Sequence, residues 1–300
     1  MIKETDGEKY EDVRSLVQEL TFTETAREFE ARNLPFGPNQ KRSLGLLNAD
    51  GVYTNLGLLL SDQCVHTVKV AVFQGREKTV FKDRREFSGT LLKQLKDTYE
   101  FIDRYNSVQS EIKGLHRRDR RNYPPEAIRE ALINAITHRD YSFRDSTLVS
   151  IYDDRIEIVS IGGLVKGISY DDIMLGVSVA RNRNLANVFY RLSLIEAYGT
   201  GISKILKSYN GSVLQPKIEV SDNAFKVTLP NINSAAEREG PDRYEASVLS
   251  LLEDTDFITR QDVETALSVS QPMAVRILKR LVDAGKIQVV GRGRNTRYTK

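Results

Sequence analysis

A carboxylate and an amide one helical turn apart are the residues of this sequence best placed to do chemistry together. Glu130 and Asn134 stand in the segment 126–141, which reads EAIREALINAITHRDY and follows Pro124 and Pro125. Proline suits the first turn of a helix, because its missing N–H would have no partner there. Residues four apart lie side by side on a helix. The carboxylate could then act as a general base toward water, and the amide could ligate a metal ion such as Mg²⁺.

Glycines and an arginine farther along the chain are predicted to complete this site. Gly199-Thr200-Gly201 stands before a predicted helix, where backbone N–H groups could approach a phosphate. Arg181 precedes it, and its guanidinium could reach phosphate oxygens. The predicted nucleotide-binding residues are Asn134, Gly162, Gly163, Arg181, Gly199, Thr200 and Gly201, with Glu130 as the candidate catalytic residue.

Each of these signals also has a purely structural interpretation. Glu130 could pair with a basic neighbour, Asn134 could cap a strand, and a Gly-Thr-Gly sequence is often only a helix start. Taken singly, the structural interpretation is favoured for each. Taken together, in this order and spacing, the residues favour a nucleotide pocket.

The segment around Asn134 also resembles a known family. Glu130, Asn134 and Ala135 look like the N-box helix of the GHKL (Bergerat-fold) ATPases. The longer string from Arg129, running into His138-Arg139-Asp140-Tyr141, resembles bacterial transcriptional regulators that are often labelled as relatives of a DNA helicase. In these regulators such a domain follows a DNA-binding module of the Schlafen AlbA type. The resemblance implies ATP and Mg²⁺ as ligands, with Asn134 holding the Mg²⁺ that accompanies the nucleotide.

One stretch departs from that family. ATPases of the broader superfamily carry an Asp-x-Gly-x-Gly box, whose Asp accepts the adenine amino group. The related regulators commonly have Asn-Pro-Gly there, whereas residues 159–164 of this chain read VSIGGL. The adenine anchor is therefore missing or replaced, which leaves both ATP binding and its hydrolysis open.

The elements that must position these residues predict an α+β protein. Residues 1–65 are expected to form a mostly helical connector, with helices over 10–20 and 23–32, and little room remains for a full AlbA-type module. Residues 66–230 are predicted to form a GHKL-like two-layer α/β sandwich, with helices on one face of a largely antiparallel sheet. Its expected elements include strands at 68–73 and 79–81, a helix over 87–105 and a hairpin at 147–152 and 155–160. The basic run 116–121 is predicted to be a solvated loop, with a phosphate or DNA contact as the alternative.

The C-terminal residues carry an uneven share of the charge. Residues 276–300 contain eight Lys and Arg against one acid, Asp283, so they carry +7 and the first 275 residues carry −4. After a predicted linker at 231–242, residues 243–300 read as three short helices and a hairpin, the layout of a winged helix-turn-helix. Such asymmetry favours double-stranded DNA as the partner. The alternative is a protein-binding module with solvated cations.

The helix from Ser270 would be the recognition helix, which enters the major groove. Val275, Ile277 or Leu278, and Leu281 are expected to face its core. The predicted DNA-binding residues are Gln271, Arg276, Lys279, Arg280, Arg292, Arg294 and Arg297.

The sequence thus predicts a cytoplasmic, homodimeric, DNA-binding transcriptional regulator that binds ATP. A single cysteine excludes an internal disulfide framework, and no apolar run approaches the roughly 20 residues of a membrane helix. The alternatives are an active ATPase that its winged helix merely localises, and a degenerate scaffold that binds no nucleotide.

Overall fold

The computed structural model describes residues 9–113, 116–196, 199–234, 241–267, 269, 271–291 and 296–299. The chain divides into two compact units, Met1–Ile232 and Asn233–Lys300.

A six-stranded mixed sheet forms the centre of the larger unit, in the order β2-β1-β5-β6-β8-β7. Only the β1–β5 pair is parallel among these neighbours. The α+β class and the predicted hairpin β5–β6 are therefore confirmed. The strands are β1 (Val68–Phe73), β2 (Phe81–Phe87), β5 (Thr147–Ile151), β6 (Arg155–Ile161), β7 (Lys217–Ser221) and β8 (Ala224–Pro230).

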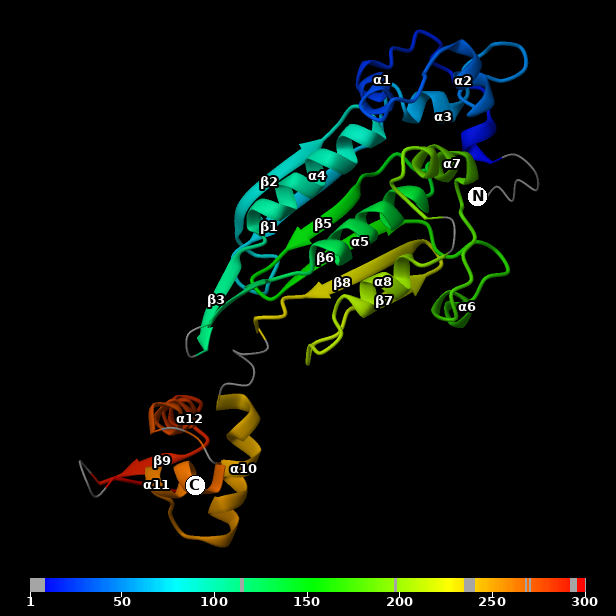
Figure 1. Ribbon diagram of the computed structural model, residues 1–300. Helices are drawn as coiled ribbons and strands as arrows, with labels where there is room; N and C mark the ends of the chain where they lie inside the picture. Colours follow the sequence, from blue (N-terminus) through cyan, green and yellow to red (C-terminus); the bar gives the residue numbers. More distant parts are fainter. Residues whose placement is uncertain are drawn as a thin grey trace. The chain divides into compact units, whose positions relative to one another are not determined.

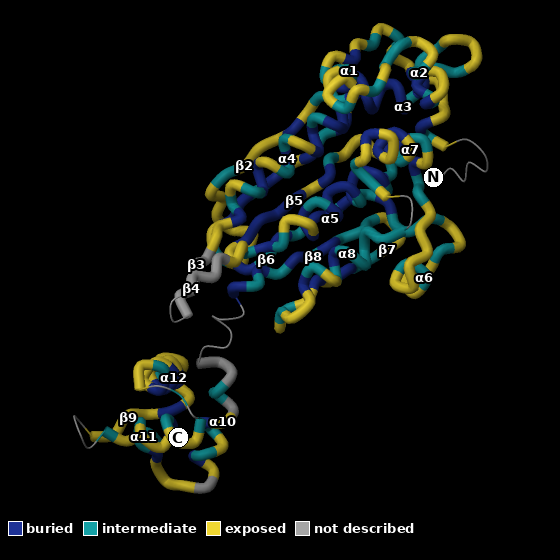
Figure 2. The backbone as a smooth tube through the Cα atoms, in the orientation of Figure 1, coloured by how far each residue is buried: buried dark blue, intermediate teal, exposed yellow. Residues whose placement is uncertain are grey.

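Helices cover one face of this sheet, as Figure 1 shows. They are α4 (Leu91–Tyr105), α5 (Pro125–Thr137) and α8 (Gly201–Lys207). Burial alternates along β6, where Ile156, Ile158 and Ser160 are buried and the residues between them are half-exposed. This period of two indicates one covered face and one open face, and Figure 2 shows the buried positions beneath the helices.

Helix α5 is buried around most of its circumference. Ala127, Ala131 and Ile133 are buried as completely as Ile128 and Leu132. The reason is its position: α5 packs on β6 and β8 beneath it and on α4 and α8 beside it. Its few polar side chains are therefore confined to one stripe.

The expected helix over residues 10–20 is wrong, because only the 3₁₀ turn η1 (Tyr10–Asp12) forms there. The following residues run extended against residues 53–55. Ser15 N–H donates to the Tyr53 carbonyl, and Asn55 N–H donates to the Val13 carbonyl. The helices that do form before the sheet are α1 (Thr23–Glu30), α2 (Pro38–Ser43) and α3 (Asn55–Leu59).

The basic run is a strand and not the loop expected. β4 (His116–Arg121) pairs with β3 (Val108–Lys113) as a separate antiparallel two-stranded sheet. At its base the Asn106 side chain donates to the Tyr123 carbonyl and accepts from the Tyr123 N–H, each at 2.9 Å. Two other boundaries shift: β2 extends to Phe87, and α4 begins only after Thr90, whose hydroxyl accepts from the Lys93 N–H.

In residues 241–299, as far as the structure describes them, the smaller unit contains three helices and a two-stranded antiparallel sheet in the order expected. Its elements are α10 (Pro241–Asp254), α11 (Arg260–Leu267), α12 (Gln271–Asp283), β9 (Gln288–Val290) and β10 (Arg297–Thr299). Ala274, Ile277, Leu278 and Leu281 of α12 enter its core. Val275 was expected there but is 46% exposed, because the buried stripe follows 274, 277, 278 and 281.

Candidate functional site

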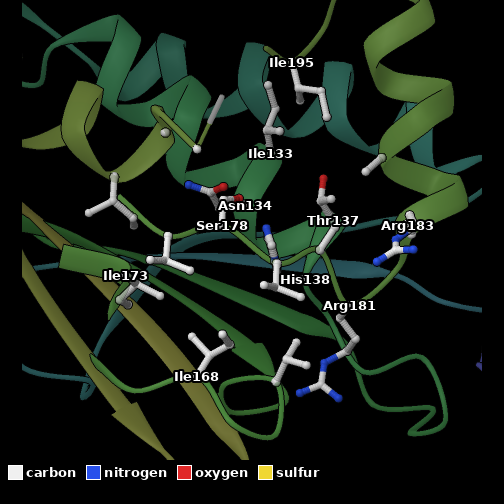
Figure 3. A pocket seen from close by; sticks show the side chains of 18 of the residues that line it. Ile133, Asn134, Thr137, His138, Ile168, Ile173, Ser178, Arg181, Arg183 and Ile195 are labelled. Atoms are coloured by element: carbon white, nitrogen blue, oxygen red, sulfur yellow. The ribbon is translucent and has the colours of Figure 1, made fainter. Parts of the chain in front are cut away.

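A cavity of about 510 Å³ opens beside α5 in the larger unit (Figure 3). Its walls are the polar stripe of α5, the residues after β6, and the segment 164–183. That segment contains α6 (Tyr170–Met174) and leads to α7 (Arg183–Arg191). This volume is within the range of small-molecule sites. All eight residues predicted from sequence line it, namely Glu130, Asn134, Gly162, Gly163, Arg181, Gly199, Thr200 and Gly201.

Glu130 lies in the wall of the cavity with 7% of its surface exposed. Arg129 forms an ion pair with Glu130 Oε1, and its second Nη donates to the Leu194 carbonyl at 2.6 Å. Burial raises the pKa of the Glu130 carboxyl, and the charges of Arg129 and Lys204 oppose that rise. The carboxyl is therefore more basic than an ordinary glutamate.

Gly201 leaves room for the side chains of Glu130 and Asn134. A Cβ atom at Gly201 would lie 3.0 Å from Asn134 Nδ2 and 3.4 Å from Glu130 Oε2. Gly199 has φ +65°, and a Cβ there would lie 2.6 Å from the Gly176 carbonyl oxygen. The glycines at the start of α8 thus admit the α5 side chains on one side and the segment 164–183 on the other.

The glycine pair after β6 is required by close backbone packing. Gly162 has φ +105°, and a Cβ at Gly163 would lie 2.3 Å from the Ser221 carbonyl oxygen. This clearance brings the end of β6 against the β7–β8 turn. Both glycines line the cavity, where their backbone is open to a ligand.

Arg181 lies at the C-terminal end of α5, beside these two glycines. Its Nη2 donates to the Gly163 carbonyl at 3.0 Å, and its Nη1 lies 3.6 Å from Asp140 Oδ2. The next residue, Asn182, is buried and donates to the carbonyls of Thr137 and Arg139, each at 2.8 Å. The segment 164–183 is thereby attached to the end of α5.

The sequence His138-Arg139-Asp140-Tyr141 has a mainly structural role after α5. Arg139 is 2% exposed, and its guanidinium donates to the Phe143 carbonyl at 3.3 Å and lies over the Tyr141 ring. His138 instead lines the cavity. Burial, aided by the charge of Arg181, lowers the pKa of His138 to about 4, so its imidazole is neutral at physiological pH.

Three buried polar atoms in the wall of the cavity have no hydrogen-bond partner within the described part of the chain. They are Asn134 Nδ2, Thr137 Oγ1 and Arg181 Nε. Buried polar groups are nearly always satisfied, so such orphans indicate a ligand or ordered water. Sequence reasoning did not propose Thr137 or His138 as ligands. Their positions could have indicated this role, because Thr137 and His138 follow Asn134 by three and four residues and so lie on the same side of the helix.

The same orphaned amide fits an ion carried by a nucleotide. Within the described ranges, no group of three or more His, Cys, Asp or Glu residues could hold a metal. Mg²⁺ accompanying a triphosphate takes most of its ligands from phosphate and water, so one amide oxygen suffices. Turning the Asn134 amide about its last bond exchanges nitrogen for oxygen at the orphaned position.

Most of the residues predicted to contact DNA are exposed to solvent on α12. Gln271, Arg276, Lys279 and Arg280 are all exposed. Arg297 lies with its guanidinium 4.0 Å from the centre of the Phe257 ring, so part of its side chain is packed within the unit. Arg292 and Arg294 lie outside the described residues.

Comparison with known proteins supports an ATPase-like domain in the larger unit. Residues 145–229 match the family described as "Putative ATP-dependent DNA helicase recG C-terminal". The matched range begins after α5, so Glu130 and Asn134 lie outside it. The match supports ATP binding by this part of the chain.

The fold is also similar to a solved structure. A crystal structure of the DIP2311 protein from Corynebacterium diphtheriae matches 98% of this chain with a TM-score of 0.65 and 20% sequence identity. The match covers 64% of that protein's chain, and at this identity it shows the fold alone. Among curated proteins, none matches this chain. No helix in the described ranges is both long and apolar enough to span a membrane.

Proposed function

We propose that the cavity beside α5 binds a nucleoside triphosphate with Mg²⁺, and that the smaller unit binds double-stranded DNA as part of a transcriptional regulator. The family match supports the nucleotide at the level of an ATP-binding domain. The observation that carries the proposal is the unpartnered amide of Asn134, which lies beside Glu130 where Gly201 leaves space. A calorimetric titration of MgATP into the full chain tests it: binding heat is expected, and its absence would refute the nucleotide part.

The two ends of this polar stripe have different proposed roles. Asn134 holds Mg²⁺ through its amide oxygen, which places the triphosphate near Gly201. Glu130, one turn earlier on α5, orients or deprotonates the attacking water. The paired cations Arg129 and Lys204 lie close enough to lower the pKa of Glu130, and they add positive charge near the phosphates.

Slow hydrolysis of the nucleotide is a second candidate function. It is favoured by the burial of Glu130, which raises the pKa of its carboxyl and makes it a better base near neutral pH. Arg129 opposes this, because its ion pair holds one of the two carboxylate oxygens. The other oxygen, Oε2, lies next to Gly201 and stays available to accept a proton from water.

The DNA-binding part of the proposal rests on α12. Its buried stripe fixes the orientation of the helix and leaves Arg276, Lys279 and Arg280 exposed on the opposite side. A recognition helix presents such residues to the major groove, and its protein commonly binds paired half-sites as a dimer. A homodimer is accordingly part of the proposal.

A further inference from the structure

The first turn of α7 is capped by a residue from the beginning of the chain. The side chain at the N-cap position, Asn182, makes no capping bond, because its amide donates to two carbonyls at the end of α5. Glu11 of η1 fills this role: its Oε1 accepts the Asn184 N–H at 2.9 Å, and its Oε2 accepts the Leu185 N–H at 3.0 Å. These are the N–H groups that a helix cap normally satisfies, and a carboxylate also suits the positive end of the helix dipole.

Glu11 is itself held by the N-terminal part of the chain. Only 1% of its surface is exposed. On one side, the Tyr10 carbonyl accepts from the Asn55 side chain at 3.0 Å, which attaches η1 to α3. On the other side, Asp12 Oδ1 accepts from Asn184 Nδ2 at 2.7 Å. The turn η1 therefore connects α3 to the first turn of α7, and Figure 1 shows α7 on the side of the N-terminal helices.

The capped helix also forms part of the cavity wall. One side of α7 is buried in the core, and residues on another side line the cavity, namely Arg183, Ala186, Asn187 and Tyr190. Arg183 is the first residue of the helix, directly before the two residues whose N–H groups are capped. Glu11 is not among the residues that line the cavity. It can therefore influence a ligand there only through α7.

Arg183 is the arginine of this wall that is free to meet an anionic ligand. Arg181 also lines the cavity, but its guanidinium is engaged by the Gly163 carbonyl and lies near the Asp140 carboxylate. Arg183 is exposed, and its guanidinium has no ion pair or hydrogen bond to any residue that the structure describes. Figure 3 shows it among the side chains that line the pocket. A permanently charged, unpaired guanidinium in such a wall suits phosphate oxygens.

We infer that Glu11 is a positioning residue for the nucleotide: its cap on α7 holds Arg183 at the cavity, where the guanidinium contacts the phosphates. The N-terminal segment thereby contributes to nucleotide affinity without touching the nucleotide. When the cap is lost, the first turn of α7 frays in part of the molecules, and the apparent affinity falls with the fraction that can still bind. This inference rests on the proposed nucleotide site.

Calorimetric titration of MgATP into full-length variants tests the inference. Glu11→Ala should weaken binding about tenfold, as the loss of a helix cap can. Glu11→Gln keeps one acceptor oxygen and should weaken binding less, and it serves as the test should the alanine variant fail to fold in thermal melting. Glu30→Ala removes an exposed carboxylate from α1, with the same change in net charge, and should bind as the wild type does. Unchanged affinity in the folded Glu11 variants would overturn the inference and leave the proposed function standing, whereas a wild type that binds no MgATP would overturn both.

A double-variant cycle with Arg183 separates positioning from general destabilisation. Arg183→Ala alone should weaken MgATP binding about tenfold, because a charge-assisted contact to phosphate is lost. If Glu11 acts through Arg183, adding the Glu11 substitution to Arg183→Ala should weaken binding no further. Weakening by the same factor with and without Arg183 would show that Glu11 does not act through this arginine, and it would overturn the inference.

Discussion

Glu130 has neighbours that act on its pKa in opposite directions. Its burial, together with the charges of Glu126 and Glu196, raises the pKa of the carboxyl, while Arg129 and Lys204 lower it. Burial prevails, so the folded protein holds a carboxyl that loses its proton at a higher pH than a free glutamate. A general base works best when its pKa approaches the working pH. The local environment thus prepares Glu130 for the role its spacing from Asn134 suggested.

Replacing this carboxylate should separate hydrolysis from binding. Glu130→Gln keeps the shape of the side chain and removes the base, so phosphate release should fall on the order of 100-fold or more while fluorescent-ATP binding persists. Because only the deprotonated form acts as a base, the wild-type rate should also fall with acidification, starting above the ordinary glutamate pKa. Glu100→Gln, which changes an exposed carboxylate on α4, is the control. Equal rates in all three proteins would exclude Glu130 as the base.

Residue spacing predicted part of the site and missed the rest. Glu130 and Asn134 could be found because helical neighbours four apart share a face. Thr137 was overlooked because its importance depends on its hydroxyl being buried without a partner. Arg181 was expected to reach the triphosphate, but the sequence does not determine which partner the long side chain of a loop arginine contacts. The structure puts it on the Gly163 carbonyl, which only the tertiary fold determines.

At the scale of elements, the segment 164–183 also supports α5. The Asn182 side chain satisfies the carbonyls of Thr137 and Arg139, which no residue of the helix itself can reach. The segment 164–183 and helix α5 therefore stabilise each other. The wall of the cavity opposite α5 should be stable only while this attachment persists.

Asn182→Ala should destabilise the larger unit. The substitution leaves two carbonyls without their donor at a buried site, which should lower the free energy of unfolding by about 1–3 kcal/mol in urea denaturation. Asn187→Ala changes an exposed residue of the same region and should remain within about 0.5 kcal/mol of wild type. Unchanged stability of the Asn182 variant would show that water replaces the two hydrogen bonds that the Asn182 side chain donates.

The elements predicted correctly from sequence are those whose local residue pattern is enough to identify them. Polar and apolar residues alternate from Arg155 to Ile158 in β6, and this period of two is visible without the structure. Residues 10–20 and 116–121 were misassigned, since each forms its conformation by pairing with another segment. The all-round burial of α5 likewise depends on α4 and α8, which lie far away in sequence.

At the scale of the whole molecule, positive charge is concentrated in residues 276–300. The net +7 of residues 276–300 contrasts with −4 for the remainder of the chain. Phosphate contacts release counterions, so binding through these cations must weaken steeply with salt. The cations of α12 lie on its exposed side, away from the core of the unit.

Removing two of these cations should reduce both DNA affinity and its salt dependence. For Arg276→Ala/Lys279→Ala in the full chain, the slope of log affinity against log salt should become shallower by about 1.8, from 0.9 per lost contact. Fluorescence anisotropy with a labelled duplex measures this slope. Lys69→Ala/Lys217→Ala removes two exposed cations from the sheet of the larger unit and serves as control. Equal slopes for both double variants would contradict DNA binding through α12.

The central claim is that Asn134 helps to hold a magnesium-bound nucleotide beside α5, and calorimetry tests it most directly. MgATP should bind the wild-type chain, and Asn134→Ala should weaken that binding by about tenfold or more, because the amide ligand of the metal is lost. Without Mg²⁺ the two proteins should bind ATP alike. Asn210→Ala, an exposed amide beyond α8, should bind MgATP as the wild type does. Undiminished MgATP affinity in the Asn134 variant would contradict the account.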